Sequence, residues 1–123
     1  MKLDEASPKP LFVQIGEIIE DMIISGDLQA GEQVFSTNQL SESFKINPAT
    51  ARKGLNQLVD KGILYKKRGL GMFIQKGAAE KIKKERKKHF YEHYLSEMMN
   101  EAKKLSISKA EIIEMISKTG EGD

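Results

Sequence analysis

Apolar residues recur at helical spacing in the first quarter of the chain. They predict an amphipathic helix that starts at Leu11 and ends near Ser25, with apolar positions at 11, 15, 18, 19, 22 and 23. Gly26 ends this helix, since glycine readily takes the left-handed conformation that follows a helix C-terminus. Residues 27–31 then predict a turn, and residues 33–35 predict a short extended segment.

Two further helices are predicted from polar residues that cap helix N-termini. Ser36-x-x-Gln39 is a capping-box pattern, which predicts a short helix through about Ser43. Asn47-Pro48 is a second start signal, because asparagine is a favoured N-cap and proline is preorganised for the first helical position. We expect this helix to run to about Lys61, where Gly62 stops it.

Residues 63–76 have the pattern of a β-hairpin. The segments 63–66 and 72–75 predict two strands, and the turn between them contains Gly69 and Gly71. Lys67 and Arg68 make this turn basic.

The chain changes character after Gly77. Residues 78–105 contain no glycine or proline and predict one long helix. Ser108-x-x-Glu111 is another capping-box pattern and predicts a last helix to about Lys118, followed by a frayed tail over 120–123. The 123 residues leave room for one domain and a small appendage.

The order of elements predicts the fold. Two helices joined by a short turn, the second beginning with small polar residues, form a helix-turn-helix, and the hairpin beside it would be a wing. We therefore expect a mostly α fold with a small β-hairpin. A winged helix-turn-helix DNA-binding domain would occupy residues 1–76, and a helical dimerisation domain would occupy residues 77–123.

The distribution of charge supports a polyanionic partner. The net charge is only +2 overall, but residues 45–76 contain eight lysines and arginines against Asp60 alone, a net charge of +7. Residues 1–44 contain two lysines against eight acids, a net charge of −6. The basic block coincides with the second helix of the helix-turn-helix and with the hairpin, which is the distribution expected of a protein that binds double-stranded DNA.

The N-terminal residues of the second helix are the candidates for reading base edges in the major groove. Thr50 can donate or accept a hydrogen bond, and Arg52 can form a bidentate contact with guanine or with a phosphate. The hairpin would lie on the DNA backbone or in the minor groove. These candidate DNA-binding residues are Asn47, Pro48, Ala49, Thr50, Arg52, Lys53, Lys67, Arg68, Gly69 and Gly71.

The C-terminal helices contain a stripe that is too apolar to face water. Two helices of one subunit offer too little surface to bury all of it, so we expect a twofold homodimer, which also matches a palindromic site. The expected dimerisation residues are Ile82, Phe90, Tyr94, Met98, Leu105, Ile112, Ile113 and Ile116.

Other classes of function find little support in the sequence. There is no cysteine, and no apolar run is long enough to span a membrane. The acidic N-terminus lacks the apolar core of a signal peptide, so the cytoplasm is the expected compartment. His89 and His93 could chelate a metal in principle, but no third histidine is present, and we expect an exposed or interfacial pair and no cofactor. No catalytic set of residues converges, so we do not expect an enzyme.

Several spaced segments resemble GntR-family transcriptional regulators over about residues 9–75. They are Pro10-Leu11-Phe12-Val13-Gln14-Ile15, Ile23-x-x-Gly26-x-Leu28-x-x-Gly31, Asn47-Pro48-Ala49-Thr50-Ala51-Arg52-Lys53-Gly54-Leu55 and Arg68-Gly69-Leu70-Gly71-Met72-Phe73-Ile74. The resemblance implies a winged helix-turn-helix, a homodimer and a palindromic operator. It also adds the entry to the first helix of the motif, Ser36, Thr37 and Asn38, to the candidate DNA-binding residues.

The sequence departs from the family pattern at two points. Asn38 replaces a phosphate-binding arginine, and Asn47-Pro48 replaces a serine and a base-reading arginine, so we expect an operator unlike those of the better-known members. The short C-terminal part resembles the YtrA-type subfamily, which implies control of transporter genes. A small-molecule effector, whose identity the sequence does not give, would need a pocket at a dimer interface, because two helices cannot enclose one alone.

These observations favour a sequence-specific, homodimeric DNA-binding repressor. Two alternatives stay open at this point. One is an architectural DNA-binding protein of low specificity, which binding competition by unrelated DNA would distinguish. The other is a small enzyme or ligand carrier, which turnover of a metabolite would reveal.

Overall fold

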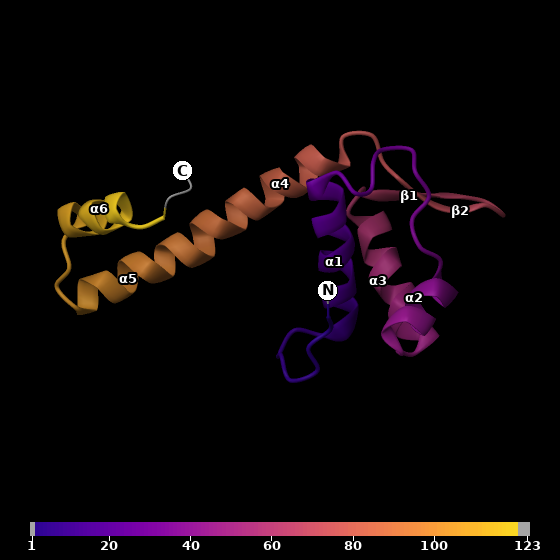
Figure 1. The fold of residues 1–123 in the computed structure, drawn as a ribbon, viewed down its shortest axis with the longest axis horizontal. Coiled ribbons are helices and arrows are strands. Elements are labelled where there is room, and N and C mark those ends of the chain that lie inside the picture. The colour runs from indigo at the N-terminus through magenta and orange to yellow at the C-terminus, as the bar shows by residue number, and fades with distance from the viewer. Residues whose placement is uncertain (1, 121–123) are drawn as a thin grey trace. The chain divides into compact units, whose positions relative to one another are not determined.

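The computed structural model describes residues 2–120 and divides into two compact units, Met1–Lys84 and Glu85–Asp123 (Figure 1). The expected frayed tail at 121–123 lies outside the described residues. The first unit contains α1 (Leu11–Ser25), α2 (Thr37–Phe44), α3 (Pro48–Asp60), β1 (Leu64–Lys67), β2 (Gly71–Ile74) and the start of α4 (Ala78–His89). The second contains the rest of α4, a π-helical segment η1 (Phe90–Leu95), α5 (Ser96–Lys104) and α6 (Lys109–Lys118).

Helix α1 packs closely against α3 because small residues lie where the two helices meet. A Cβ atom on Gly54 would lie 3.0 Å from Cγ2 of Ile15 and 3.1 Å from the carbonyl oxygen of Phe12. The Gln57 Nε2 donates a hydrogen bond of 2.7 Å to that same carbonyl oxygen. The close contact and the hydrogen bond together hold the α3 helix against the first turn of α1.

The predicted caps of the helix-turn-helix are confirmed. The Ser36 Oγ accepts a hydrogen bond from the Gln39 backbone N–H at 3.1 Å, and the Gln39 Oε1 accepts one from the Ser36 N–H at 2.8 Å. The Asn47 Oδ1 accepts a hydrogen bond from the Ala49 N–H at 2.7 Å, directly before Pro48 opens α3. Between these helices Lys45 takes the left-handed conformation, with φ 54°, which makes the turn tight.

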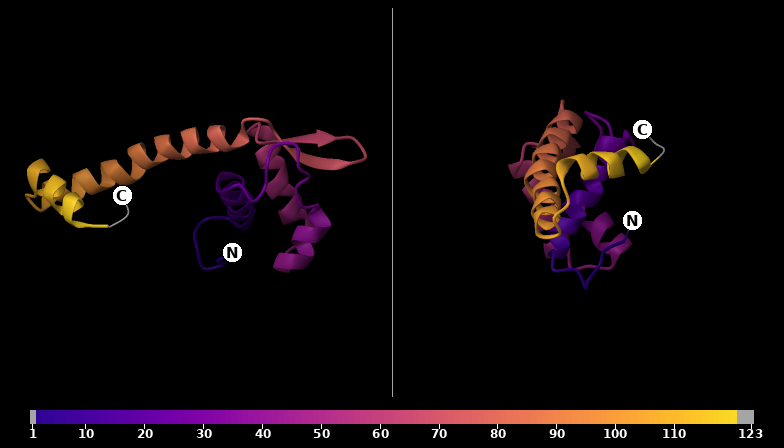
Figure 2. Two further views of the ribbon diagram at one scale, coloured as in Figure 1. Left: turned by 45° about the horizontal axis from the view of Figure 1, so that its top comes forward. Right: turned by 90° about the vertical axis from the view of Figure 1, so that its left-hand side faces the viewer.

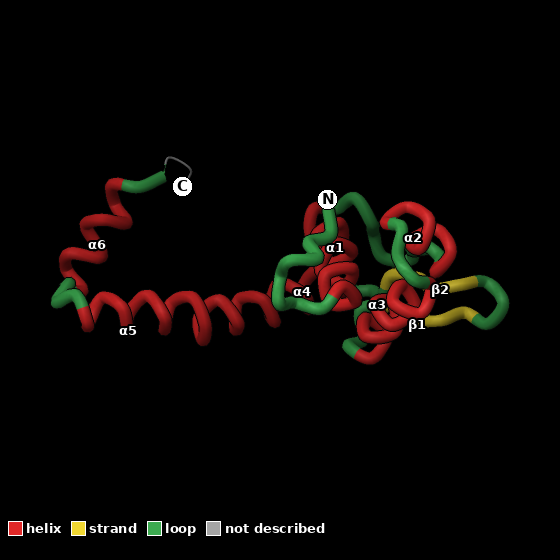
Figure 3. Tube along the Cα trace, turned by 90° about the horizontal axis from the view of Figure 1, so that it is seen from below, coloured by secondary structure: helices red, strands yellow, loops and turns green. Residues whose placement is uncertain are grey.

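The hairpin pairs β1 with β2 in antiparallel register, from Leu64 opposite Ile74 to Lys67 opposite Gly71. Both strands lie one residue away from their predicted positions. The extended segment before α2 joins the outer edge of β2, where Gln33 forms an isolated bridge with Phe73. The hairpin projects from the helices of the first unit as a wing (Figure 3).

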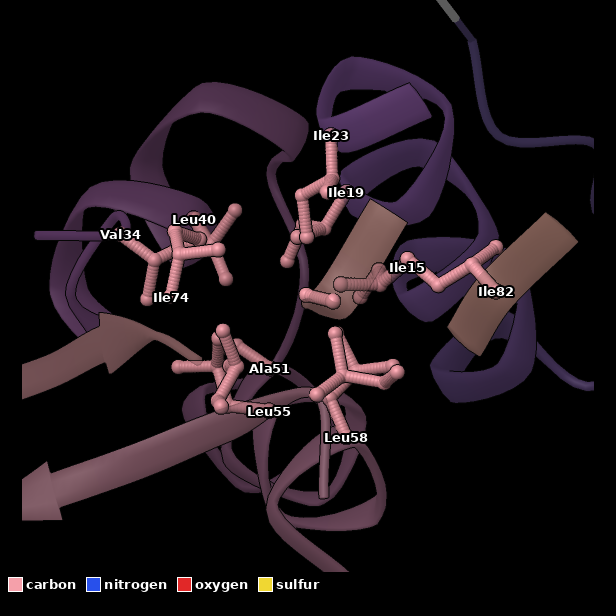
Figure 4. Packing of buried hydrophobic residues seen from close by; sticks show 13 residues of the cluster. Ile15, Ile19, Ile23, Val34, Leu40, Ala51, Leu55, Leu58, Ile74 and Ile82 are labelled. Carbon is pink, nitrogen blue, oxygen red and sulfur yellow. The ribbon is translucent and has the colours of Figure 1, made fainter. Parts of the chain in front are cut away.

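One apolar cluster holds the first unit together, and it includes the start of α4 (Figure 4). Its buried members are Ile15, Ile19, Ile23, Val34, Leu40, Ala51, Leu55, Leu58, Ile63, Leu64, Ile74, Ala78 and Ile82. Burial of this kind contributes about 25 cal/mol for each Å² of apolar surface removed from water. The cluster thus joins three helices, the hairpin and the first two turns of α4 in one core.

The burial of Ile82 corrects two expectations. Ile82 is only 1% exposed and lies inside the core of the first unit, so its place among the dimerisation residues is wrong. For the same reason the first compact unit extends to Lys84, whereas the sequence placed the boundary between residues 76 and 77. The stripe in the sequence showed that Ile82 is buried, but periodicity alone does not identify the surface that covers it.

The second unit confirms the capped last helix and modifies the long one. The Ser108 Oγ accepts a hydrogen bond from the Glu111 N–H at 3.1 Å, which starts α6 as predicted. Residues 78–104 are helical throughout, but Phe90–Leu95 form a π-helical turn, a feature that helical periodicity does not distinguish. A turn at 105–108 connects α5 with α6 (Figure 2).

The apolar side chains of the second unit fall into two groups. Ala102 and Ile112 are buried within the chain, so Ile112 packs largely inside its own subunit, and its contribution to a dimer surface stays a prediction. The large apolar side chains that are exposed in this unit are Phe90, Tyr91, Tyr94, Met98, Leu105, Ile113, Met115 and Ile116. No helix of the described residues is both long enough and apolar enough to cross a membrane.

Candidate nucleic-acid interface

The outer face of α3 is polar because its inner face supplies the core. Ala51, Leu55 and Leu58 are buried, and helical geometry therefore turns the residues at 49, 52 and 53 outward. Arg52 is exposed, and no other described residue forms a hydrogen bond or an ion pair with its guanidinium. Arg52 can therefore offer its full set of donors to a bidentate partner.

The first turn of α3 presents small side chains to solvent. Asn47, Pro48 and Ala49 are exposed, and Thr50 is partly buried. The Asn47 Oδ1 already accepts the capping hydrogen bond from Ala49, so this side chain orients the start of α3. The small residues leave room for a close approach of the α3 N-terminus, whose dipole attracts negative charge.

Lys53 has a partner within the chain that its position in the sequence does not reveal. Its Nζ lies 4.2 Å from the centre of the Phe12 ring, which is a cation–π contact between α3 and α1. The side chain is still exposed. The contact holds the charge of Lys53 beside the first turn of α1, so its contact with DNA stays a prediction.

The start of α2 contains a residue that caps the helix and residues that are exposed to solvent. The Ser36 hydroxyl accepts the capping hydrogen bond, and its own O–H remains able to donate. Thr37 is partly buried, whereas Asn38 is exposed. Ser36 and Asn38 are therefore the two of these three predicted residues that are exposed to a phosphate.

The wing is basic and has an aromatic face. The rings of Tyr65 and Phe73 are stacked across the two strands, with centres 5.9 Å apart. The Lys67 Nζ lies 4.6 Å from the centre of the Phe73 ring, and both Lys66 and Arg68 are exposed. The wing therefore presents three cations close together.

The two predicted glycines of the wing both have positive φ. Gly69 has φ 78° and Gly71 has φ 116°, a backbone conformation that L-residues with side chains rarely adopt. A Cβ atom on Gly69 would meet open space, whereas a Cβ atom on Gly71 would lie 2.7 Å from the Gln33 Nε2. Both glycines are thus favoured by their backbone conformation, and at Gly71 a side chain would in addition displace the Gln33 amide.

Sequence reasoning missed Gln33 as a part of this surface. Its Nε2 donates a hydrogen bond of 2.8 Å to the backbone oxygen of Leu70, at the tip of the wing. Thirty-seven positions separate the two residues, and no local pattern connects them. Only the pairing of residues 32–34 with β2 brings them together.

The histidine pair lies in the second unit, away from these residues in the sequence. The rings of His89 and His93 meet edge to face, with centres 4.4 Å apart. Within residues 2–120 no group of three or more histidines, cysteines or carboxylates could hold a metal ion.

Comparison with known proteins points to one family. The family described as "Bacterial regulatory proteins, gntR family" matches residues 11–74, more than half of the chain. The HTH-type transcriptional repressor NagR of Bacillus subtilis is 35% identical over 80 residues, which are 65% of this chain and only 33% of NagR. The HTH-type transcriptional regulator YhcF of the same organism is 28% identical over 116 residues, 94% of each chain.

Solved structures agree with these relatives. A GntR family transcriptional regulator from Listeria monocytogenes is similar with a TM-score of 0.79 and 28% identity, over 96% of this chain and 100% of that one. YtrA from Sulfolobus acidocaldarius is similar with a TM-score of 0.58 and 28% identity, over 61% of this chain and 79% of YtrA. The DNA-binding domain of AraR, solved with operator ORX1, has a TM-score of 0.50 and 27% identity over 60% of this chain and 98% of that domain.

These similarities and the winged helix-turn-helix fold indicate the same family, and the similarity to YtrA is consistent with the YtrA-type subfamily. The chain therefore belongs to the gntR family of bacterial regulatory proteins, and it has the winged helix of that family's DNA-binding domains.

Proposed function

We propose that the protein is a homodimeric repressor in the cytoplasm that occupies a palindromic operator. One observation carries the proposal: the unpaired guanidinium of Arg52 lies exposed on the first turns of α3, next to Thr50. Arginine forms bidentate contacts with the O6 and N7 atoms of guanine, and threonine can donate a hydrogen bond to a base, accept one from it, or meet a thymine methyl group. Base-edge contacts of this kind specify a sequence.

Contacts with phosphates would position the protein on the duplex. The exposed cations of the wing, Lys66, Lys67 and Arg68, suit this role, and Asn38 supplies a neutral donor at the start of α2. Such contacts release counterions and make the affinity depend on salt. The operator complex of the AraR DNA-binding domain supports this use of the same fold.

A twofold dimer is supported by the second unit. Its large apolar side chains remain exposed in a single subunit, and an apolar patch of this kind marks an interaction surface. A second copy of the chain offers the same patch, and a twofold axis would then place two α3 helices on two half-sites. The exposed candidate dimerisation residues are Phe90, Tyr94, Met98, Leu105, Ile113 and Ile116.

Repression is the expected outcome of binding, since a dimer on promoter DNA blocks the polymerase. NagR, which is similar over the DNA-binding unit, is named a transcriptional repressor. Transporter genes as targets follow from the YtrA-type resemblance alone. A small-molecule effector would bind between the two subunits.

The test begins with selection of bound sequences from random DNA by the full-length protein. We expect a palindromic consensus with half-sites about one helical turn apart or a multiple of it. Affinity for this operator should exceed affinity for unrelated DNA by about 10³-fold or more. Light scattering of the complex should give two chains for each operator. Equal affinity for all sequences would replace the proposal with a low-specificity architectural role.

A further inference from the structure

The tip of the wing holds one apolar side chain. Leu70 stands between Gly69 and Gly71 and is 64% exposed. Its neighbours before the tip are the exposed cations of the wing. A single exposed leucine is unremarkable on a protein surface, so its meaning depends on how its backbone is held.

Both backbone polar groups of Leu70 are fixed. Its N–H donates to the Lys67 oxygen at 2.9 Å, which closes the turn of the hairpin. Its own oxygen accepts from the Gln33 Nε2 at 2.8 Å. With both groups bonded inside the protein, the side chain is the part of Leu70 that remains available to a partner.

Gln33 is itself anchored to the edge of the wing. Its backbone bridges to Phe73, and the next residue, Val34, donates to the Met72 oxygen at 2.9 Å. Gly71 leaves room for the amide, since a Cβ atom there would lie 2.7 Å from the Gln33 Nε2. The segment before α2 therefore shapes the wing tip before any DNA is bound.

We propose that Gln33 is a positioning residue that presents Leu70 to the minor groove of the operator, where the leucine favours A·T over G·C pairs. The inference rests on the proposed function. It adds a second determinant of sequence to the one assigned to α3.

Groove dimensions and chemistry carry this step. The minor groove is about 6 Å wide, which admits a narrow hairpin tip but not a helix. Its walls are phosphates, which match the charges of Lys67 and Arg68. Its floor differs between base pairs, because only G·C presents the guanine N2 amino group there. The Leu70 side chain, packed against the guanine N2 amino group, would leave that hydrogen-bond donor without an acceptor, which is unfavourable. An A·T pair has no such donor in the minor groove and so avoids this cost.

Replacing guanine with inosine distinguishes recognition of the guanine N2 amino group in the minor groove from recognition of base edges in the major groove. An inosine·cytosine pair presents the major groove of G·C and lacks the N2 amino group. Starting from the selected operator, each flanking A·T pair is replaced in turn by G·C and by inosine·cytosine, and affinities are measured by fluorescence anisotropy. At the pair below the wing, we expect the wild type to bind inosine·cytosine about fivefold or more tightly than G·C.

Variants assign this ratio to the two residues. Leu70→Ala and Gln33→Met should each bring the ratio close to one, because the first removes the contact and the second removes the donor at similar side-chain length. Gln33→Lys restores a donor and should recover the ratio. Gln29→Met is the matched control, since Gln29 is an exposed glutamine on the preceding turn with a contact of 3.5 Å to Gly26, and it should keep the wild-type ratio.

The ratio is insensitive to partial unfolding, because unfolded protein lowers both affinities equally. A wild-type ratio of one at every flanking pair would overturn the inference. An unchanged affinity ratio in Leu70→Ala would also overturn the inference. An unchanged ratio in Gln33→Met would show that Gln33 does not position Leu70. If the protein bound a selected operator through Arg52 under any of these outcomes, the proposed function would stand without the wing preference. If no sequence were preferred at all, the proposed function itself would fail.

Discussion

The two units of the chain solve the problem of burying apolar side chains in different ways. The first unit covers most of its large aliphatic side chains with its own helices and hairpin, so that Ile15, Leu58 and the other members of its core are inaccessible to solvent. The second unit buries Ala102 and Ile112 and leaves rings such as Phe90 and Tyr94 more than half exposed.

This difference in exposed surface indicates where DNA and where a second protein surface are expected to bind. A surface that is polar and basic over a closed core suits a phosphate backbone, and the exposed face of α3 and the wing have that character. A surface of large apolar side chains suits another protein surface of the same kind.

The largest effect is expected from charging the apolar face of the second unit. Phe90→Glu combined with Met98→Glu should produce a monomer with a folded first unit, because two carboxylates cannot be buried at an interface without partners. Operator affinity should fall by about 10²- to 10⁴-fold, since each half-site then binds alone. Light scattering and anisotropy measure the two quantities.

The control for that variant places the same charges elsewhere on the unit. Ser96→Glu with Asn100→Glu adds the same two negative charges at exposed polar positions of α5 and should keep the dimer. A dimer that survives the Phe90 and Met98 changes would remove this face from the interface.

Two isoleucines, one in each unit, test the division directly. Ile82→Ala should lower the free energy of unfolding of the first unit by about 2–5 kcal/mol, because it opens a cavity in a closed core. Ile113 is 63% exposed in one subunit, so Ile113→Ala should leave the free energy of unfolding of the first unit unchanged and should weaken association of the two subunits. Urea denaturation at several protein concentrations distinguishes them, since only a change in association depends on concentration.

If both variants lowered stability equally at every protein concentration, the contrast between the units would be wrong.

Much of the fold follows from local signals in the sequence. Ser36, Asn47 and Ser108 mark helix starts with side chains that satisfy backbone N–H groups a few residues ahead, and the structure has each of these caps. Gly69 and Gly71 mark a turn that needs positive φ. Such signals are readable because cause and effect lie within five residues of each other.

The rest depends on contacts that are distant along the chain. The placement of Lys53 over Phe12, the hydrogen bond from Gln33 to Leu70 and the burial of Ile82 all join separate segments. Periodicity identified Ile82 as a buried position but assigned it to the dimer surface, whereas the core of the first unit covers it. The candidate DNA-binding residues of α3 could be named because helical geometry alone separates the outer face from the core.

A substitution on the DNA-binding face should leave the second unit untouched. Arg52→Ala should weaken operator binding by about 1–3 kcal/mol and relax specificity at one position of each half-site, while the dimer persists. Lys67→Ala is the companion variant and should weaken all DNA about equally, with a salt dependence shallower by roughly one unit of slope. Salt titrations on operator and random DNA measure both.

Unchanged affinity of Arg52→Ala for both kinds of DNA would show that the assignment of Arg52 to base reading is wrong.

The smallest effects are expected from the two glycines of the wing. Gly69→Ala should cost about 1 kcal/mol through its positive φ alone, because its Cβ atom would meet open space. Gly71→Ala should cost more, since the added atom also displaces the Gln33 amide. Thermal unfolding compares the variants, and helix content by circular dichroism should stay constant. Equal losses for both glycines would mean that the hydrogen bond from Gln33 contributes nothing to the wing.

The inclusion of Ala78 and Ile82 in the first core determines how the protein can be cut and recombined. A fragment that stops after Gln75 would lose both side chains and leave the buried cluster of the first unit incomplete. A fragment that continues to Lys84 carries its complete core with it. For an engineer who wants to attach this winged-helix unit to a foreign oligomerisation module, the usable joint therefore lies inside α4, about two turns after the helix begins, and not in the loop where the sequence changes character.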